Sequence, residues 1–226
     1  MPVVKNRSLR FLGTLGIGLF ILCIPFFLIT TNLRWAVNEI RLYEYGFNKY
    51  MVSEKTGFSD EELLDVAQGL IHYFNTGNGK EEFEIFNERE VAHLEDVRSL
   101  ITLCYCVQQA TLVYLIIVAL AGFIWQRKRF SPLLIRMMVG GSILTIALLA
   151  FMGIAALADF DWLFTTFHHL FFSGDSWILS GYLPQIFTWG FFYDAALFII
   201  GAVVVEALVI GGLGGFFILR WRKTRG

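Results

Sequence analysis

The chain has 226 residues, of which 56% are hydrophobic and 16% are charged. Soluble domains are typically about 45–50% apolar and about 25% charged, so the composition excludes an ordinary soluble domain and indicates an integral membrane protein. The formal net charge is −1, and we expect no nucleic-acid partner.

Four apolar runs are long enough to cross a bilayer as helices, which takes about 20 residues each. The runs at residues 11–31, 99–126 and 137–158 hold no charged residue, and the run at 195–219 holds one, Glu206. We therefore predict an all-α membrane protein with four transmembrane helices, an extracytoplasmic helical cap and an interfacial aromatic segment. The predicted segments are the N-terminus with the first transmembrane helix (1–31), the cap (32–98), the second transmembrane helix (99–126), a cytoplasmic loop (127–136), the third transmembrane helix (137–158), the interfacial segment (159–193), and the fourth transmembrane helix with the C-terminus (194–226).

The charges predict which way these segments face. The N-terminus, the 127–136 loop and the C-terminus carry 3, 4 and 4 basic residues and no acidic residue. Cytoplasmic loops of membrane proteins are enriched in Lys and Arg, so we expect both termini and the middle loop to be cytoplasmic. The cap and the interfacial segment then face outward over the same leaflet.

The cap is the one sizeable polar region, because it holds 14 of the 19 acidic residues. Within it, Ser59 with Glu62 and Asn87 with Glu90 have the spacing of N-cap pairs. The first pair predicts an amphipathic helix that begins near residue 60. The second predicts one long helix that begins near residue 88 and continues through the second apolar run.

The interfacial segment is the most unusual stretch of the chain. Residues 160–193 carry 13 of the 37 aromatic residues and two adjacent histidines, His168 and His169. Aromatic side chains with polar tips favour the membrane–water boundary, and acidic residues, glycine and proline break the segment into pieces too short to span. We therefore expect it to lie in the interface over the mouth of the helical bundle. Imidazole is the side chain best suited to proton transfer near neutral pH.

A further histidine, His93, shares a predicted helix face with Glu90 and Asp96 at three-residue spacing. A carboxylate beside an imidazole orients the ring and raises its basicity, as a general base requires. Two plainer interpretations stay open. His93 also fits a solvated, charged helix face, and His168 with His169 also fits a pair of amphipathic interfacial side chains.

The neighbouring histidines point about 100° apart on a helix. His168 shares its face with Phe164, Phe171 and Phe172, so we expect it, rather than His169, to face the same cavity as His93. The sequence has no Gly-x-Ser-x-Gly, Walker, HExxH or CxxC motif. Paired histidines at headgroup depth instead favour acyl transfer in which the substrate provides its own nucleophile.

Three stretches, taken in order, resemble the bacterial lipoprotein intramolecular transacylase family. They are YEYGFNKY at 43–50 followed by Thr56-Gly57, EVAHLEDV at 90–97, and FHHLFF at 167–172 with Asp175-Ser176-Trp177. The resemblance covers nearly the whole chain, including four spans. It implies a multi-pass protein of the bacterial cell membrane that acts on a lipoprotein whose N-terminal cysteine carries a diacylglyceryl thioether. The sn-2 acyl chain would move from the glycerol oxygen to the cysteine α-amine, giving the lyso form.

The resemblance also implies roles for particular residues, no cofactor, no metal, and a monomer among membrane lipids. The implied catalytic residues are His93 and His168, and the implied substrate-binding or orienting residues are Glu90, Asp96, Tyr45, Asp175 and Trp177. Two other functions remain as alternatives. One is a metal-dependent lipid hydrolase with His93, Asp96, His168 and His169 as ligands, and the other is a non-catalytic scaffold of the cell envelope.

Overall fold

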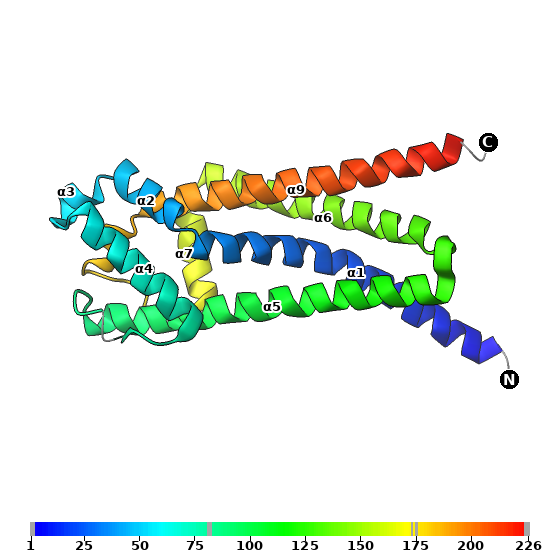
Figure 1. The fold of residues 1–226 in the computed structure, drawn as a ribbon, viewed down its shortest axis with the longest axis horizontal. Helices are drawn as coiled ribbons and strands as arrows, with labels where there is room; N and C mark the ends of the chain where they lie inside the picture. The colour runs from blue at the N-terminus through cyan, green and yellow to red at the C-terminus, as the bar shows by residue number, and fades with distance from the viewer. Residues whose placement is uncertain (1–2, 81–82, 173, 175, 224–226) are drawn as a thin grey trace. The chain divides into compact units, whose positions relative to one another are not determined.

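The structure is a computed structural model that describes residues 3–80, 83–172, 174 and 176–223. In these residues the chain is all-helical (Figure 1), which confirms the predicted fold class. The four long helices are α1 (Val3–Asn38), α5 (Glu88–Gln126), α6 (Ser131–Ala158) and α9 (Trp189–Lys223). Each has the length and composition to cross a membrane. The shorter elements are α2 (Ile40–Lys49), α3 (Val52–Thr56), α4 (Asp60–Thr76), the 3₁₀ turn η2 (Arg127–Arg129), α7 (Phe160–Phe171) and α8 (Leu183–Ile186).

Three helix ends differ from the expected segment limits, and one of them is the start of α6 at Ser131, inside the segment expected to be the 127–136 loop. The first membrane helix does not end with its apolar run near residue 31 but continues to Asn38, and the last begins at Trp189, inside the segment expected to be interfacial. A charged residue does not by itself end a helix, whereas a residue with an extended backbone does. Helix α2 follows α1 after Glu39. The backbone of Glu39 is extended, and its carboxylate accepts from the Arg41 N–H.

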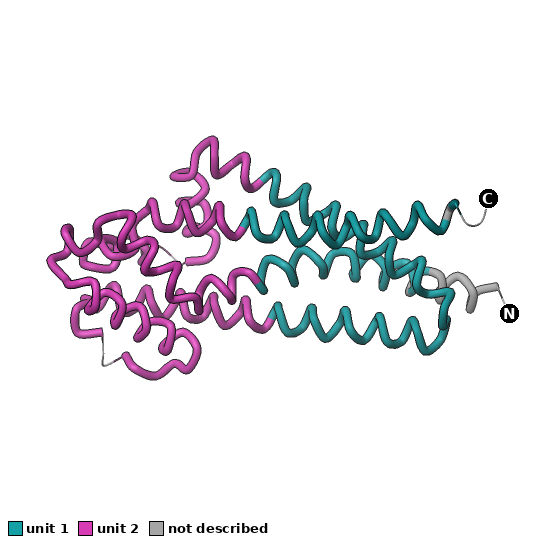
Figure 2. Tube along the Cα trace, turned by 45° about the horizontal axis from the view of Figure 1, so that its top comes forward, with its two compact units in different colours: residues 1–31, 107–151, 200–226 teal, residues 32–106, 152–199 magenta. Residues whose placement is uncertain are grey.

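The chain divides into two compact units, which Figure 2 shows in different colours. Unit 1 comprises residues 1–31, 107–151 and 200–226, and unit 2 comprises residues 32–106 and 152–199. All four long helices contribute to both units. The predicted site residues that the structure describes all belong to unit 2.

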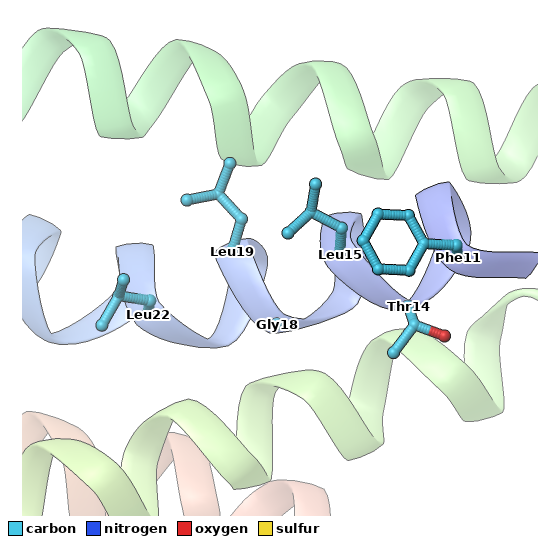
Figure 3. A pocket seen from close by; sticks show the side chains of 6 residues that line it. All are labelled: Phe11, Thr14, Leu15, Gly18, Leu19 and Leu22. Atoms are coloured by element: carbon cyan, nitrogen blue, oxygen red, sulfur yellow. The ribbon is translucent and has the colours of Figure 1, made fainter. Parts of the chain in front are cut away.

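Unit 1 is held together by close helix approaches at glycines. A Cβ added at Gly141 of α6 would collide with Ile24 of α1, and one added at Gly214 of α9 would lie 2.6 Å from Val139 of α6. Small residues permit such approaches between membrane helices. The apolar groove drawn in Figure 3 also lies in this unit, has a volume of about 420 Å³, and contains none of the predicted site residues. Its lining residues are Phe11, Thr14, Leu15, Gly18, Leu19 and Leu22.

Unit 2 has its own apolar core, in which α4 is central. The Ser59 hydroxyl accepts from the Glu62 N–H and the Glu62 carboxylate accepts from the Ser59 N–H, so the predicted capping box is present. Helix α4 ends at Gly77, whose φ of +80° favours glycine. Its buried face, including Leu63 and Leu70, packs with residues of α2, α5, α8 and α9. This core fixes the first turns of α5, from which one half of the site projects.

Candidate functional site

Helix α7 places His168. The Asp159 carboxylate accepts from the Trp162 N–H at 2.9 Å and so caps the first turn. His168 is one of the two buried residues of this helix, together with Phe160. His169, one residue on, is exposed. The predicted facing of the two histidines is therefore confirmed.

Helix α5 places His93. The Asn87 side chain accepts from the Glu90 N–H at 3.0 Å, and the Glu90 carboxylate accepts from the Asn87 N–H at 3.0 Å. This reciprocal cap confirms the predicted helix start. His93 lies one turn after Glu90 and is only 7% exposed, so it is not part of a solvated helix face.

The two buried imidazoles, 75 residues apart in sequence, face each other. The ring centroids of His93 and His168 are 6.2 Å apart, and the ring planes are inclined by 21°. Phe172 packs against both rings, with centroid distances of 4.9 Å to His93 and 5.3 Å to His168. The pair is therefore held by aromatic walls and shielded from water, where electrostatic and hydrogen-bonding interactions are stronger.

The tautomer of His168 follows from one contact. Its Nδ1 lies 2.7 Å from the carbonyl oxygen of Phe164. Because a carbonyl oxygen can only accept, Nδ1 carries the proton and donates it, which leaves a lone pair on Nε2 of the neutral ring. Burial, the largest cause, lowers the pKa of His168; the bond to Phe164 raises it, and His169 lowers it further. The net lowering of the pKa favours a neutral ring, with its lone pair on Nε2.

Trp177 adjoins both neighbouring histidines. Its ring centroid is 4.9 Å from that of His168 and 5.4 Å from that of His169, which meets it edge-on. Its Nε1 is buried and has no hydrogen-bond partner among the described residues. The Nδ1 of His93 is likewise buried and has no hydrogen-bond partner among the described residues. The site thus contains two buried ring nitrogens whose hydrogen-bonding capacity is not used by the described part of the chain.

The Glu90 carboxylate has a different partner from the one its spacing suggests. It accepts from the backbone N–H of Leu183 at 2.7 Å, besides the bond to Asn87. Glu90 is 1% exposed, and the Cα of Gly181 packs directly against the carboxylate. Glu90 therefore fastens the loop after Trp177 to the first turn of α5. Neither hydrogen bond of this carboxylate is to His93.

Two of the remaining predicted site residues are exposed. Asp96 is one of them, although its charge still interacts with that of His93. Tyr45, on α2, is 50% exposed, and Lys49 lies over its ring at 5.4 Å. Asp175 lies outside the described residues.

Sequence reasoning missed several contributors. Phe164 acts through its main-chain carbonyl, for which a side-chain motif gives no signal. Asp194, in the first turns of α9, accepts from Lys49 at 2.6 Å and from the Tyr50 hydroxyl at 2.7 Å, joining α2 to α9. The sequence did offer one signal for this contact, because Asp194 is a carboxylate directly before the last apolar run.

The metal alternative can be compared with the geometry. Of its four proposed ligands, Asp96 and His169 are exposed, whereas His93 and His168 are stacked ring to ring. In the described part of the chain, no group of three or more His, Cys, Asp or Glu side chains is placed to hold a metal ion.

The family model and the solved structures that match this chain carry the same family name. Residues 18–192 match the family model described as lipoprotein intramolecular transacylase Lit. The structure is similar to the in meso structure of the membrane integral lipoprotein intramolecular transacylase Lit from Bacillus cereus, with a TM-score of 0.83 and 19% identity over 95% of this chain and 99% of that one. A variant of the Bacillus protein with a histidine-to-alanine substitution gives a TM-score of 0.74 at 19% identity, over 96% and 99% of the two chains. An uncharacterised protein of Aquifex aeolicus (strain VF5) is 25% identical over 193 residues, which are 80% of this chain and 84% of the relative.

Proposed function

Because this chain belongs to the lipoprotein intramolecular transacylase family and is therefore a transacylase, we propose that its reaction is carried out at the His93–His168 pair. The single observation that carries the proposal is the pairing itself: two buried imidazoles, 75 residues apart in sequence, with centroids 6.2 Å apart. Buried histidines in an aromatic pocket fit acid–base chemistry on a lipid-linked substrate, because such a site excludes water that would hydrolyse the ester.

The proposed substrate is a lipoprotein whose N-terminal cysteine carries a diacylglyceryl thioether and a free α-amine. The amine attacks the carbonyl carbon of the sn-2 ester, so an N–C bond forms as the C–O bond to glycerol breaks. The net result moves the acyl chain from oxygen to nitrogen and one proton from nitrogen to oxygen. Both reacting groups belong to one molecule, so positioning supplies much of the rate, and well-oriented intramolecular reactions reach effective molarities of about 10⁵–10⁸ M.

His168 moves the proton in this proposal. Its Nδ1–H is occupied by the Phe164 carbonyl, so Nε2 is the acceptor for the amine proton. The resulting imidazolium then donates the proton to the glycerol oxygen as the ester bond breaks. One imidazole thus acts first as base and then as acid. Its lowered pKa supports the first step, because the ring is neutral when the substrate arrives.

His93 holds the reacting ester in this proposal. Its Nδ1 is buried without a partner among the described residues, and its ring faces that of His168. A glutamine amide keeps a hydrogen-bond donor at this position but is not a base. His93→Gln is therefore expected to retain more activity than His93→Ala. If His93 were instead the base, both variants would lose the same activity.

The proposed location is the outer face of the bacterial cell membrane. The support is the segregation of charge, since the ends of the chain and residues 127–136 are basic while unit 2 holds most of the acidic residues. Exposed aromatic and aliphatic side chains on α7, such as Trp162 and Leu170, fit a helix in contact with lipid. The acyl chains of the substrate would then reach the histidines from the bilayer.

The metal-dependent hydrolase is the second candidate, and it has weaker support because Asp96 and His169 are exposed. Chelators are expected to leave activity unchanged. Inhibition by a chelator that zinc reverses would favour the hydrolase. A non-catalytic scaffold does not fit an enzyme of this family.

Mass spectrometry of lipoprotein N-termini tests the proposal in cells that otherwise make diacylated lipoproteins. Expression of the chain is expected to give the lyso form, with one acyl chain on the cysteine nitrogen. His93→Ala and His168→Ala are each expected to abolish it while the protein still accumulates in the membrane. His72→Ala is the matched control, because His72 is exposed on α4. Normal product from either site variant would remove that residue from the mechanism.

A further inference from the structure

The indole N–H of Trp177 is an unusual feature of unit 2. Its Nε1 is buried and has no hydrogen-bond partner among the described residues. Leaving a buried donor unsatisfied costs the desolvation of that group, about 1–3 kcal/mol, and such groups are few in native structures. A phenylalanine, although smaller, would pack an aromatic ring here without that cost. The nitrogen therefore calls for a functional explanation.

The contacts of Trp177 place this donor beside the reacting groups. The ring packs on His168 at 4.9 Å on one side and meets His169 at 5.4 Å on the other. The loop that follows is fastened to α5 by the bond from the Leu183 N–H to Glu90. The indole thus has a fixed position next to the imidazole that accepts the proton.

Among the described residues, the ring nitrogens that lie beside His168 are those of His93 and Trp177, and the other neighbours of the ring have no side-chain donor. Phe164, Phe167 and Phe172 all pack against its ring, and none has an N–H or O–H group. Yet the reaction places negative charge on the ester carbonyl oxygen when the amine adds to the carbonyl carbon. Stabilising that charge takes donors held about 2.7–3.1 Å from the oxyanion in a site that excludes water.

We propose that the Trp177 indole N–H is a hydrogen-bond donor to the oxyanion of the tetrahedral intermediate. This inference rests on the function proposed above. As the N–C bond forms, the carbonyl π electrons move to oxygen, and Trp177 donates a hydrogen bond to that oxygen without transferring its proton. When the carbonyl re-forms, the electrons of the C–O bond leave with the glycerol oxygen, which takes the proton from His168. Trp177 ends unchanged.

The experiment compares purified full-length Trp177→Phe and wild-type protein in detergent, with a synthetic S-diacylglyceryl lipopeptide that has a free N-terminus. Phenylalanine keeps an aromatic ring against His168 and removes the N–H. We expect kcat to fall about 100-fold, as for the loss of one oxyanion donor, with KM changed less than about twofold. Removal of an unsatisfied buried donor raises stability and the smaller ring lowers it, so Tm is expected to change little. Trp162→Phe is the matched control, since Trp162 is 57% exposed on α7.

Two results would overturn this inference. One is a kcat for Trp177→Phe within about threefold of the wild-type value; the other is a fall in kcat that comes with a fall in Tm, which indicates that the indole serves packing alone. Parallel measurements on His93→Ala and His168→Ala distinguish a failure of the Trp177 donor role from a failure of the proposed histidine mechanism. If both are inactive and Trp177→Phe is normal, the donor role alone fails. If either histidine variant is active, the underlying mechanism fails as well.

Discussion

Gly181→Ala tests how the loop after Trp177 is held. The Cα of Gly181 packs against the buried Glu90 carboxylate, and an added Cβ would lie 2.5 Å from the Glu90 Cδ. Carbon atoms in favourable contact are about 3.5–4.0 Å apart. The loop or the carboxylate therefore has to move by roughly 1 Å. The Gly181 backbone itself has no positive φ, so the effect comes from space and not from backbone strain.

The magnitude follows from the bond that this movement breaks. The Leu183 N–H donates to Glu90 at 2.7 Å, and a lengthening of about 1 Å takes the pair beyond hydrogen-bond distance. A hydrogen bond to a charged group contributes about 1.5–3 kcal/mol, which for a chain of this size corresponds to a Tm lower by roughly 3–12 °C. Displacement of the loop also moves Trp177, and a misplacement of about 1 Å near reacting groups costs up to about 100-fold in rate.

The assay is thermal unfolding together with lyso-lipopeptide formation by the purified protein. Gly201→Ala is the control, because a Cβ there meets nothing within 4 Å and alanine is favoured over glycine in a helix. We expect Gly181→Ala to lower both Tm and turnover, and Gly201→Ala to lower neither. A Gly181→Ala protein with wild-type Tm and turnover would refute the assignment of Glu90 as the fastening point.

Three other predictions concern the histidines and the topology. His168→Gln is expected to lose nearly all initial rate in the same assay while His169→Gln keeps most of it; the opposite pattern would assign the catalytic role to His169 instead of His168. The proton-accepting form of His168 is the neutral ring, and burial lowers its pKa below the ordinary 6.5, so kcat should fall with acidification only below pH 6.5. A midpoint above that value in a kcat–pH profile would exclude His168 as the base. In a protein without its native cysteines, Asn78→Cys should react with an impermeant thiol reagent in intact cells and Gln126→Cys should not; the reverse labelling would invert the proposed orientation.

Local sequence patterns predicted the helices well where a cap or an apolar run determines them. The pairs Ser59–Glu62 and Asn87–Glu90 mark helix starts because both partners lie within one turn. The ends of α1 and α9 were less well predicted. Hydropathy reports which residues are apolar, but α1 continues to Asn38 beyond its apolar run, since hydrogen bonding along a helix does not require apolar side chains.

The site was predicted in part. Helical spacing correctly separated His168 from His169, because the facing of neighbours on one helix is a local property. The approach of His93 to His168 spans 75 residues; the charge pattern predicted that both lie over the same leaflet, but no local pattern determines the distance between them. Spacing also suggested that Glu90 orients His93, but its carboxylate instead binds the Leu183 N–H, 93 residues away. A long-range partner replaced the local one because the buried backbone N–H needs an acceptor.

The most direct test of the central claim is a double-variant cycle on the rate of lyso-lipopeptide formation. Wild type, His93→Ala, His168→Ala and the double variant are compared as purified proteins with the same diacylated lipopeptide. Groups that act as one unit are strongly non-additive, and loss of a general acid–base group costs about 10²–10⁴ in rate. We predict that each single variant loses at least about 100-fold and that the double variant is no slower than the worse single variant. Single variants near the wild-type rate, or losses that simply multiply in the double variant, would contradict a mechanism built on the His93–His168 pair.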